Sequence, residues 1–395
     1  MRARLRRWGG LLGVVLLATA VPVATRTASA GLEDCSADYL VDEVLANGAR
    51  WQLCWEPRAY KGVILHNVTY TPIGGQPVEV LYEAYLAQIH VPYDDNGARF
   101  HDVSDYGLGT NFATLTAADC PNGTLVDDAG EDILCQTEAP TGYAAKDYDH
   151  VRQGTSLNLF STSCIGAYCY VVSWSFDDDG TIRPEVGATG SLQRYGGNNR
   201  TGWQTGPDHP AFGGPVAVAH LHNYYWKLDF DVDGTANDRV EELEAGFAPG
   251  TNRTRLRNTR RQLANEAARR VSPTTFRSWR VRDTVTRNDE NHPISWELVP
   301  STDHIFRGPE RFTQNEVYVT TQNACEDFAS HNPTTGGCGA HAAAFVNGQA
   351  VSDPVIWYGT SFHHLPRDED EEHMHPHWSG FSIVPRDLTA DNPAD

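Results

Sequence analysis

The amino-acid sequence predicts an all-β dominated fold, a large β-sandwich with few helices. Short runs rich in aromatic and β-branched residues recur between residues 62 and 385, and Gly, Asn, Asp and Pro separate them. Neither an internal repeat nor a low-complexity linker divides the chain. These observations predict one domain of many strands over residues 31–395.

The expected strands follow one another along the chain. They are GVILHNVTYTP (62–72), EVLYEAYLAQIHVPY (79–93), CYVVSWSFDDDGTIRPEVGATG (169–190), YYWKLDFDVDG (224–234), SWRVRDTV (278–285), ISWELVP (294–300), EVYVTTQ (316–322), PVIWYGTSF (354–362) and HWSGFSIVP (377–385). Within the third run, DDDGT (177–181) has the composition of a hairpin turn. The stretch 254–271 is polar, basic and rich in helix formers, so a helix or a long loop is expected there.

Residues 1–30 have the features of a secretory signal peptide. A basic start is followed by an apolar run too short to span a bilayer and by Ala28-Ser29-Ala30, a small-residue cleavage site. No later stretch is long and apolar enough for a membrane span. We therefore expect a secreted, extracellular protein. The segment holds five arginines and no acidic residue, so its removal makes the net charge of −20 more negative by five, which disfavours nucleic acid as a partner.

The eight cysteines of an exported chain are expected to form disulfides. The simplest arrangement pairs neighbours in sequence: Cys35–Cys54, Cys120–Cys135, Cys164–Cys169 and Cys325–Cys338. The sequence alone does not fix this connectivity. Cys164 and Cys169 also need a bend or bulge between them before their sulfurs can meet.

Histidine pairs indicate a metal site. His220 and His222 point to the same side of an expected strand, so both imidazoles can reach one ion, and His363 or His364 offers a third ligand. Three neutral imidazoles suit copper or zinc. A single such pair can equally be solvated or packed, and the same alternatives apply to His373, His375 and His377, which could also hold a second metal.

Seven segments in the same order resemble the catalytic domain of the copper amine oxidases, the topaquinone enzymes. They are GVILHNVTY (62–70), LYEAYLAQIHVPYDD (81–95), HDVSDYGLG (101–109), AYCYVVSWSFDDDGTIRPEVGATG (167–190), HLHNYYWKLDFDVDG (220–234), WYGTSFHHLPR (357–367) and HMHPHWSGFSIVP (373–385). The resemblance covers nearly all of residues 50–393. It implies that family's β-sandwich, a bound copper ion and a homodimer.

The resemblance also implies roles for individual residues. Tyr168 aligns with the tyrosine that is oxidised to topaquinone, Asp102 with the catalytic base and Tyr93 with the tyrosine that hydrogen-bonds the cofactor. His220, His222 and His364 align with the copper ligands. Asp229 and Asp231 align with peripheral calcium ligands, although a solvated turn also accounts for these two aspartates. The implied reaction converts a primary amine and dioxygen into an aldehyde, hydrogen peroxide and ammonia.

The sequence departs from the family at the cofactor motif. The family reads Thr-x-x-Asn-Tyr-Asp/Glu-Tyr, whereas residues 164–170 read CIGAYCY, so Ala167 replaces the asparagine that orients the cofactor ring. Phe100 replaces the family's gate tyrosine. A Cys164–Cys169 disulfide could restrain Tyr168 instead, and a Cys169–tyrosine crosslink or a thiolate near copper is the alternative. Two other functions therefore stay open: copper–oxygen chemistry with unmodified Tyr168, and copper binding without catalysis.

Overall fold

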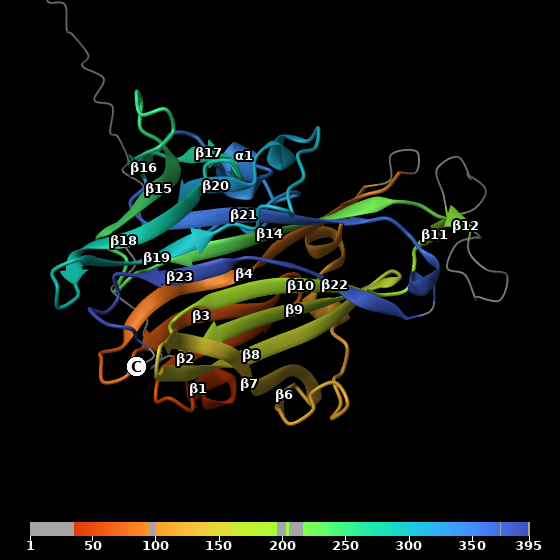
Figure 1. Cartoon of the computed structure of the whole chain (residues 1–395). Coiled ribbons are helices and arrows are strands. Elements are labelled where there is room, and N and C mark those ends of the chain that lie inside the picture. Colours follow the sequence, from red (N-terminus) through yellow and green to blue (C-terminus); the bar gives the residue numbers. More distant parts are fainter. Residues whose placement is uncertain (1–34, 95–98, 196–202, 205–215, 372, 394–395) are drawn as a thin grey trace, which may run out of the picture.

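The computed structural model describes residues 35–94, 99–195, 203–204, 216–371 and 373–393. Two large antiparallel sheets pack against each other, with β14 and β21 facing β9 and β10 (Figure 1). This arrangement confirms the predicted β-sandwich. The expected signal peptide lies outside the described residues, and the one-domain assignment stays a prediction.

The first sheet runs in the order β1-β2-β3-β4-β14-β21-β20-β17, and β5 pairs with β4. Its strands are β1 (Leu40–Val44), β2 (Arg50–Arg58), β3 (Gly62–Thr71), β4 (Val78–Pro92), β5 (Arg99–His101), β14 (His220–Phe230), β17 (Ala267–Arg269), β20 (Val317–Thr321) and β21 (Pro354–His364). The two central strands β14 and β21 are neighbours although they lie far apart in sequence, which brings their histidines together.

The second sheet runs in the order β16-β15-β18-β19-β23-β10-β9-β8-β7-β6, and β22 pairs with β10. Its strands are β6 (Thr124–Asp128), β7 (Glu131–Asp147), β8 (His150–Ile165), β9 (Tyr168–Asp177), β10 (Ile182–Gly190), β15 (Asp238–Phe247), β16 (Leu256–Leu263), β18 (Ser278–Arg287), β19 (Pro293–Val299), β22 (Met374–Gly380) and β23 (Ser382–Arg386). A third, small sheet joins β11 (Arg194–Tyr195), β13 (Val216–Ala217) and β12 (Trp203–Gln204).

Helices are short throughout the described chain. They are α1 (Ala342–Phe345), the 3₁₀ turns η2 (Ala37–Tyr39), η4 (Gly109–Asn111), η5 (Arg311–Gln314), η6 (Thr335–Gly337) and η7 (Asp368–Asp370), and the π-helical turn η3 (Asp102–Tyr106). Within the described residues, none is long and apolar enough to cross a membrane.

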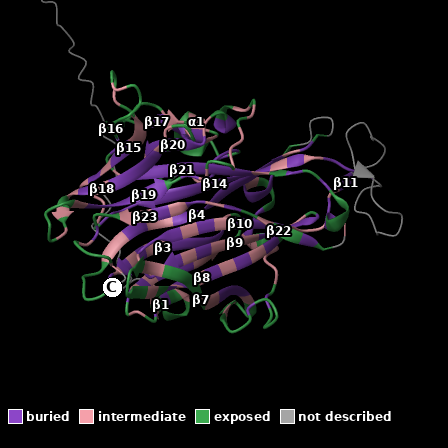
Figure 2. Ribbon diagram, viewed as in Figure 1, coloured by how far each residue is buried: buried purple, intermediate pink, exposed green. Residues whose placement is uncertain are grey.

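The main core lies between the two sheets. Trp226 of β14 meets Trp174 of β9 edge to face, with ring centroids 5.0 Å apart, and both side chains are buried. Figure 2 shows buried residues along the strands of both layers and exposed residues in the connecting loops. Because alternate residues of a strand face opposite sides, Tyr225 points to the outer face of the first sheet, where a second cluster packs against α1 and η5.

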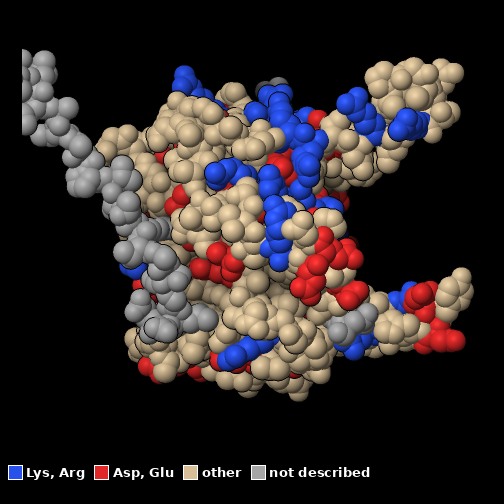
Figure 3. All heavy atoms as spheres, turned by 90° about the vertical axis from the view of Figure 1, so that its left-hand side faces the viewer, with Lys and Arg blue, Asp and Glu red and all other residues tan. Residues whose placement is uncertain are grey.

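The expected helix or long loop over 254–271 is wrong. Residues 256–263 form β16, an exposed strand at the edge of the second sheet, and residues 267–269 form β17. The basic side chains on β16 pair with acids of the neighbouring strand β15, as Arg261 does with Glu242 and Arg260 with Glu241. Figure 3 shows Lys and Arg beside Asp and Glu on this side of the molecule. Cross-strand charge pairing therefore overrides the local helix preference.

Two local predictions are confirmed. The turn at 177–181 joins β9 to β10 in a hairpin, with Gly180 at φ 90°. The four disulfides have the sequential pairing: Cys35–Cys54, Cys120–Cys135, Cys164–Cys169 and Cys325–Cys338.

Candidate metal centre and adjoining cavity

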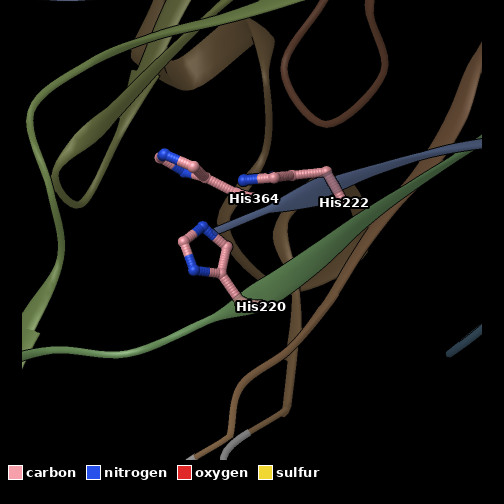
Figure 4. Close-up of side chains that lie close together, drawn as sticks. All are labelled: His220, His222 and His364. Carbon is pink, nitrogen blue, oxygen red and sulfur yellow. The ribbon is translucent and has the colours of Figure 1, made fainter. Parts of the chain in front are cut away.

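Three buried histidines converge between the two sheets. His220 and His222 stand on the same face of β14, and β21 places His364 directly opposite His220. Figure 4 shows the three rings with their nitrogens directed toward a common space. One nitrogen from each ring lies within 4.8 Å of the other two, and no ring is more than 3 % exposed. The expected ligand set therefore comes together, with His364 rather than its neighbour His363, which is exposed.

Apart from the contacts with the Tyr168 hydroxyl, the hydrogen bonds of these rings leave one lone pair on each for a metal. His220 Nδ1 donates to the Val218 carbonyl at 2.9 Å, so His220 Nε2 can bind a metal. His364 Nε2 donates to Asp370 Oδ2 at 3.1 Å, so His364 Nδ1 can bind a metal. His222 Nε2 is buried and has no hydrogen-bond partner. An unsatisfied buried nitrogen is costly, and a metal ion at this point would satisfy it.

The protonation of the rings also suits a metal. Burial lowers the pKa of His220 to about 3, and it lowers the pKa values of His222 and His364, each further lowered by its histidine neighbours. The imidazoles are therefore neutral near pH 7, as metal ligands must be. Asp370 is fully buried and fixes the tautomer of His364, a carboxylate–histidine arrangement typical of metal sites.

The Tyr168 hydroxyl adjoins this cluster. It lies 2.7 Å from His220 Nε2 and 2.8 Å from His364 Nδ1, the two atoms left for a metal. Tyr168 opens β9 directly after the two-residue turn Gly166-Ala167, and Gly166 adopts φ 63° as such turns require. This β-hairpin supplies the bend that Cys164 and Cys169 need: they are directly opposed and disulfide-bonded, which contradicts a Cys169–tyrosine crosslink.

Asp102 is a buried carboxylate with a perturbed pKa. It begins the π-helical turn η3, and its Oδ2 accepts a hydrogen bond from the Tyr170 hydroxyl at 2.7 Å. Burial raises the pKa of Asp102 to about 7, and the nearby Asp105 adds to this, while the bond from Tyr170 opposes it. The Tyr170 oxygen also lies 3.3 Å from His222 Nδ1, so one tyrosine links the carboxylate to a histidine of the cluster.

A cavity of about 170 Å³ opens onto both Tyr168 and Asp102. Its remaining lining is mostly aromatic or small: Val91, Tyr93, Phe100, Tyr106, Ile165, Gly166, Ala167, Tyr170 and Gln193. Asp102 is the one carboxylate among these described lining residues. A small molecule in this cavity would therefore contact the tyrosine and the carboxylate together.

Tyr93 and Phe100 sit beside one another at this cavity. The Tyr93 ring stacks on His220 with centroids 4.4 Å apart and meets Phe100 edge to face at 5.6 Å. Tyr93 thus supports a histidine of the cluster, while its predicted bond to a cofactor stays a prediction. Phe100 stands in the cavity wall, as a gate residue would.

The other predicted ligands fall into two groups. Asp229 and Asp231 are buried, and a carboxylate oxygen of each lies within 4.8 Å of one from Asp353, a third candidate ligand. His373 and His375 are exposed. The third histidine, His377, instead lies 3.8 Å from Asp370.

Sequence reasoning missed two residues of the centre. Tyr170 stood in the cofactor motif, two positions after Tyr168, and this period-two spacing was a usable signal because it places both rings on one face of the strand. Asp370 lay in the acidic run RDEDEE, where nothing in the composition separates a buried acid from exposed ones.

The sequence of this chain is similar to those of known proteins. The family model for the enzyme domain of copper amine oxidases matches residues 41–395. The primary amine oxidase of Klebsiella aerogenes is 25% identical over 415 residues, covering 90% of this chain and 54% of that protein. The histamine oxidase of Arthrobacter globiformis is 26% identical over 389 residues, covering 87% of this chain and 56% of that protein. The chain spans about half the length of the curated relatives it matches.

The fold is also similar to that of a solved structure. A copper-containing benzylamine oxidase from Hansenula polymorpha superimposes with a TM-score of 0.72 at 19% sequence identity. The match covers 95% of this chain and 64% of that one.

Proposed function

This chain belongs to the copper amine oxidase family, and from that premise we propose that it is a copper-dependent oxidase of primary amines. Its products are an aldehyde, hydrogen peroxide and ammonia, and dioxygen is the electron acceptor. The observation that carries the proposal is the Tyr168 hydroxyl, which lies within 2.8 Å of two histidine nitrogens in a cavity that Asp102 also lines.

Copper is the metal that fits His220, His222 and His364. Imidazole donors alone suit copper or zinc, and the family favours copper. The buried, unpartnered His222 Nε2 supports a bound ion at this point. Copper and a topaquinone formed from Tyr168 would supply the oxidation–reduction chemistry, one toward dioxygen and the other toward the amine.

Asp102 is the residue that we expect to remove the proton from the amine-bearing carbon. Its Oδ2 already accepts the Tyr170 hydroxyl, so Oδ1 remains to take the proton. A pKa of about 7 means that the carboxylate is ionised in part of the molecules at neutral pH and can also hold a proton, which suits a general base. Tyr170 fixes its orientation, and the buried setting limits competition from water.

The cavity supports a small apolar monoamine as the substrate. Its aromatic and small lining residues would pack against an aryl or alkyl group. No second carboxylate stands among the described lining residues to pair with the distal ammonium of a diamine. Phe100 lacks the hydroxyl of the family's gate tyrosine, so it makes the cavity wall more apolar and adds to the preference for an apolar amine.

The Cys164–Cys169 disulfide takes over the restraint that the family's asparagine provides. It closes the hairpin whose turn holds Ala167, immediately before Tyr168. Unmodified Tyr168 remains the second candidate state, and Ala167 is the observation that favours it, because a methyl side chain cannot orient a cofactor ring by hydrogen bonding.

Three further features belong to the same proposal. Calcium binds at Asp229, Asp231 and Asp353, since hard cations prefer clustered carboxylate oxygens. The protein is secreted, which the basic and apolar N-terminal segment and the four disulfides support. It acts as a homodimer, which light scattering on the purified protein would test.

Oxygen uptake tests the proposed activity. Copper-loaded protein supplied with benzylamine should consume dioxygen and release hydrogen peroxide, whereas copper-free protein should do neither. Putrescine, a diamine, should be the poorer substrate. Oxygen uptake that stays at the copper-free rate for every primary amine tried would refute the proposal.

A further inference from the structure

A second histidine cluster lies on the opposite face of the first sheet. His90 is in β4 and pairs in register with Asn223, the neighbour of the cluster residue His222, so its side chain faces away from the metal centre described above. His101 ends β5 directly opposite His90, and Glu310 precedes η5. Three separate elements thus bring two imidazoles and a carboxylate together.

We propose that His90, His101 and Glu310 bind a zinc ion, as a second metal site with a ligand set separate from the three histidines described above. One ligand atom from each residue lies within 4.8 Å of the other two. His90 Nε2 is 3.1 Å from Glu310 Oε1, and the two imidazole centroids are 4.9 Å apart. Ligands about 2.1 Å from a tetrahedral zinc are about 3.4 Å from each other, so the His90–Glu310 pair at 3.1 Å would open slightly, whereas a pair at the 4.8 Å limit would have to close.

Neighbouring side chains orient both rings. His101 Nδ1 is 2.7 Å from Ser330 Oγ, and donation to this oxygen leaves Nε2 to bind the metal. In the metal-free state His90 Nε2 donates to Glu310, because Nδ1 lies 3.2 Å from the Asn223 side-chain nitrogen. Zinc at Nε2 leaves the ring proton on Nδ1, so the Asn223 amide has to turn its oxygen toward the ring and exchange its present bonds to the His90 carbonyl and the Ser361 hydroxyl.

Burial and access both suit a bound cation. His90 and His101 are 2 % and 5 % exposed, and burial, with the neighbouring histidines, lowers the pKa of His101 to about 4, so the ring is neutral. A cavity of about 310 Å³ is lined by His90 and Glu310 and gives an ion a route to them. Arg99 and Asp94 also line this cavity, so the positive charge of the arginine is opposed by the two carboxylates of Asp94 and Glu310.

The donor set favours zinc over calcium and magnesium. Two imidazoles and one carboxylate, with a fourth position open to the cavity, form a zinc site, whereas calcium and magnesium take oxygen ligands. A zinc ion here would tie β4, β5 and the segment before η5 to one point. Since His101 directly precedes Asp102, the ion would also fix the start of the turn that carries the carboxylate.

Metal content and zinc titration test the site. Full-length protein is first loaded with copper and freed of excess metal, then titrated calorimetrically with zinc, and both metals are measured by mass spectrometry after gel filtration. We expect one zinc per chain in addition to the copper. Glu310→Gln and His101→Asn should each weaken zinc binding by at least about tenfold while the copper content is kept.

His66→Asn is the matched control. His66 also contacts a glutamate, Glu56, at 3.2 Å, but belongs to none of the candidate metal clusters of the described chain, so zinc binding should be unchanged. Glu310 is about one third exposed, and its replacement should leave the fold intact. Zinc binding that is equal in Glu310→Gln, His101→Asn and the unaltered protein would overturn the proposal. So would the absence of zinc beyond the copper site, or a second copper that Glu310→Gln removes.

Discussion

Replacing Tyr170 by phenylalanine should move the pH dependence of catalysis. The Tyr170 hydroxyl donates to Asp102 Oδ2 at 2.7 Å, and this bond lowers the pKa of a carboxyl that burial has raised to about 7. Without the donor, the ionised carboxylate loses the hydrogen bond that stabilises its charge, so the pKa of Asp102 should rise. Because the ionised form is the base, activity near neutral pH should fall.

The size of the effect follows from the strength of the bond. A hydrogen bond to a charged group contributes about 1.5–3 kcal/mol, and about 1.4 kcal/mol corresponds to one pH unit, so the pKa should rise by about one to two units. At pH 7 the ionised fraction would then drop from about one half to between about one tenth and one hundredth. We expect kcat/KM at pH 7 to fall by about 5- to 50-fold and to recover as the pH increases.

The assay is a pH profile of kcat/KM, taken after the copper content of the variant has been measured, because Tyr170 also lies 3.3 Å from His222 Nδ1. Tyr224→Phe is the matched control: its hydroxyl is equally buried but has no hydrogen-bond partner, so the profile should not move. A Tyr170→Phe profile that is lowered equally at every pH would refute the reasoning.

Three other changes probe separate parts of the site. The double variant Cys164→Ser/Cys169→Ser should lose about 2 kcal/mol of stability, because the disulfide closes only a short loop, and it should form less quinone. Unchanged activity and an unchanged thermal midpoint would contradict the proposed restraint of Tyr168 by the disulfide. Asp370→Asn should weaken copper binding by about 10- to 100-fold in a chelator competition, whereas the exposed Asp368→Asn should not; equal affinities would contradict its orienting role. Asp102→Asn should lower kcat by about 10²- to 10⁴-fold while copper binding persists, and near-normal turnover would remove it as the base.

The fold was predictable where its signal is local or periodic. Alternating apolar positions identified many of the core strands, and DDDGT identified the β9–β10 turn, but the core strands β2 and β8 were not among the expected ones. The prediction for residues 256–263 was wrong because the preference of an arginine-rich segment for a helix is weak. The neighbouring strand β15 offers acidic residues at matching positions, with which the arginines pair. Such a partner is visible only once the chain has folded.

The metal ligands of the site were predictable from the sequence, whereas the residues that orient those ligands were less so. His220 and His222 share a strand, so their spacing alone placed them together. The identity of the third ligand, His364, came from the family resemblance. Asp370 and the His90–His101–Glu310 cluster depend on contacts between segments distant in sequence, which no local pattern reports.

The central claim is that Tyr168 becomes a quinone beside copper, and peptide mass analysis of residues 161–170 tests it most directly. Protein prepared without metal is loaded with copper in air, with and without phenylhydrazine. We predict that Tyr168 gains the mass of the quinone and that phenylhydrazine adds to it, in the copper-loaded sample only. Plain tyrosine at position 168 in protein that has bound copper would contradict the account and favour other copper–oxygen chemistry, or none.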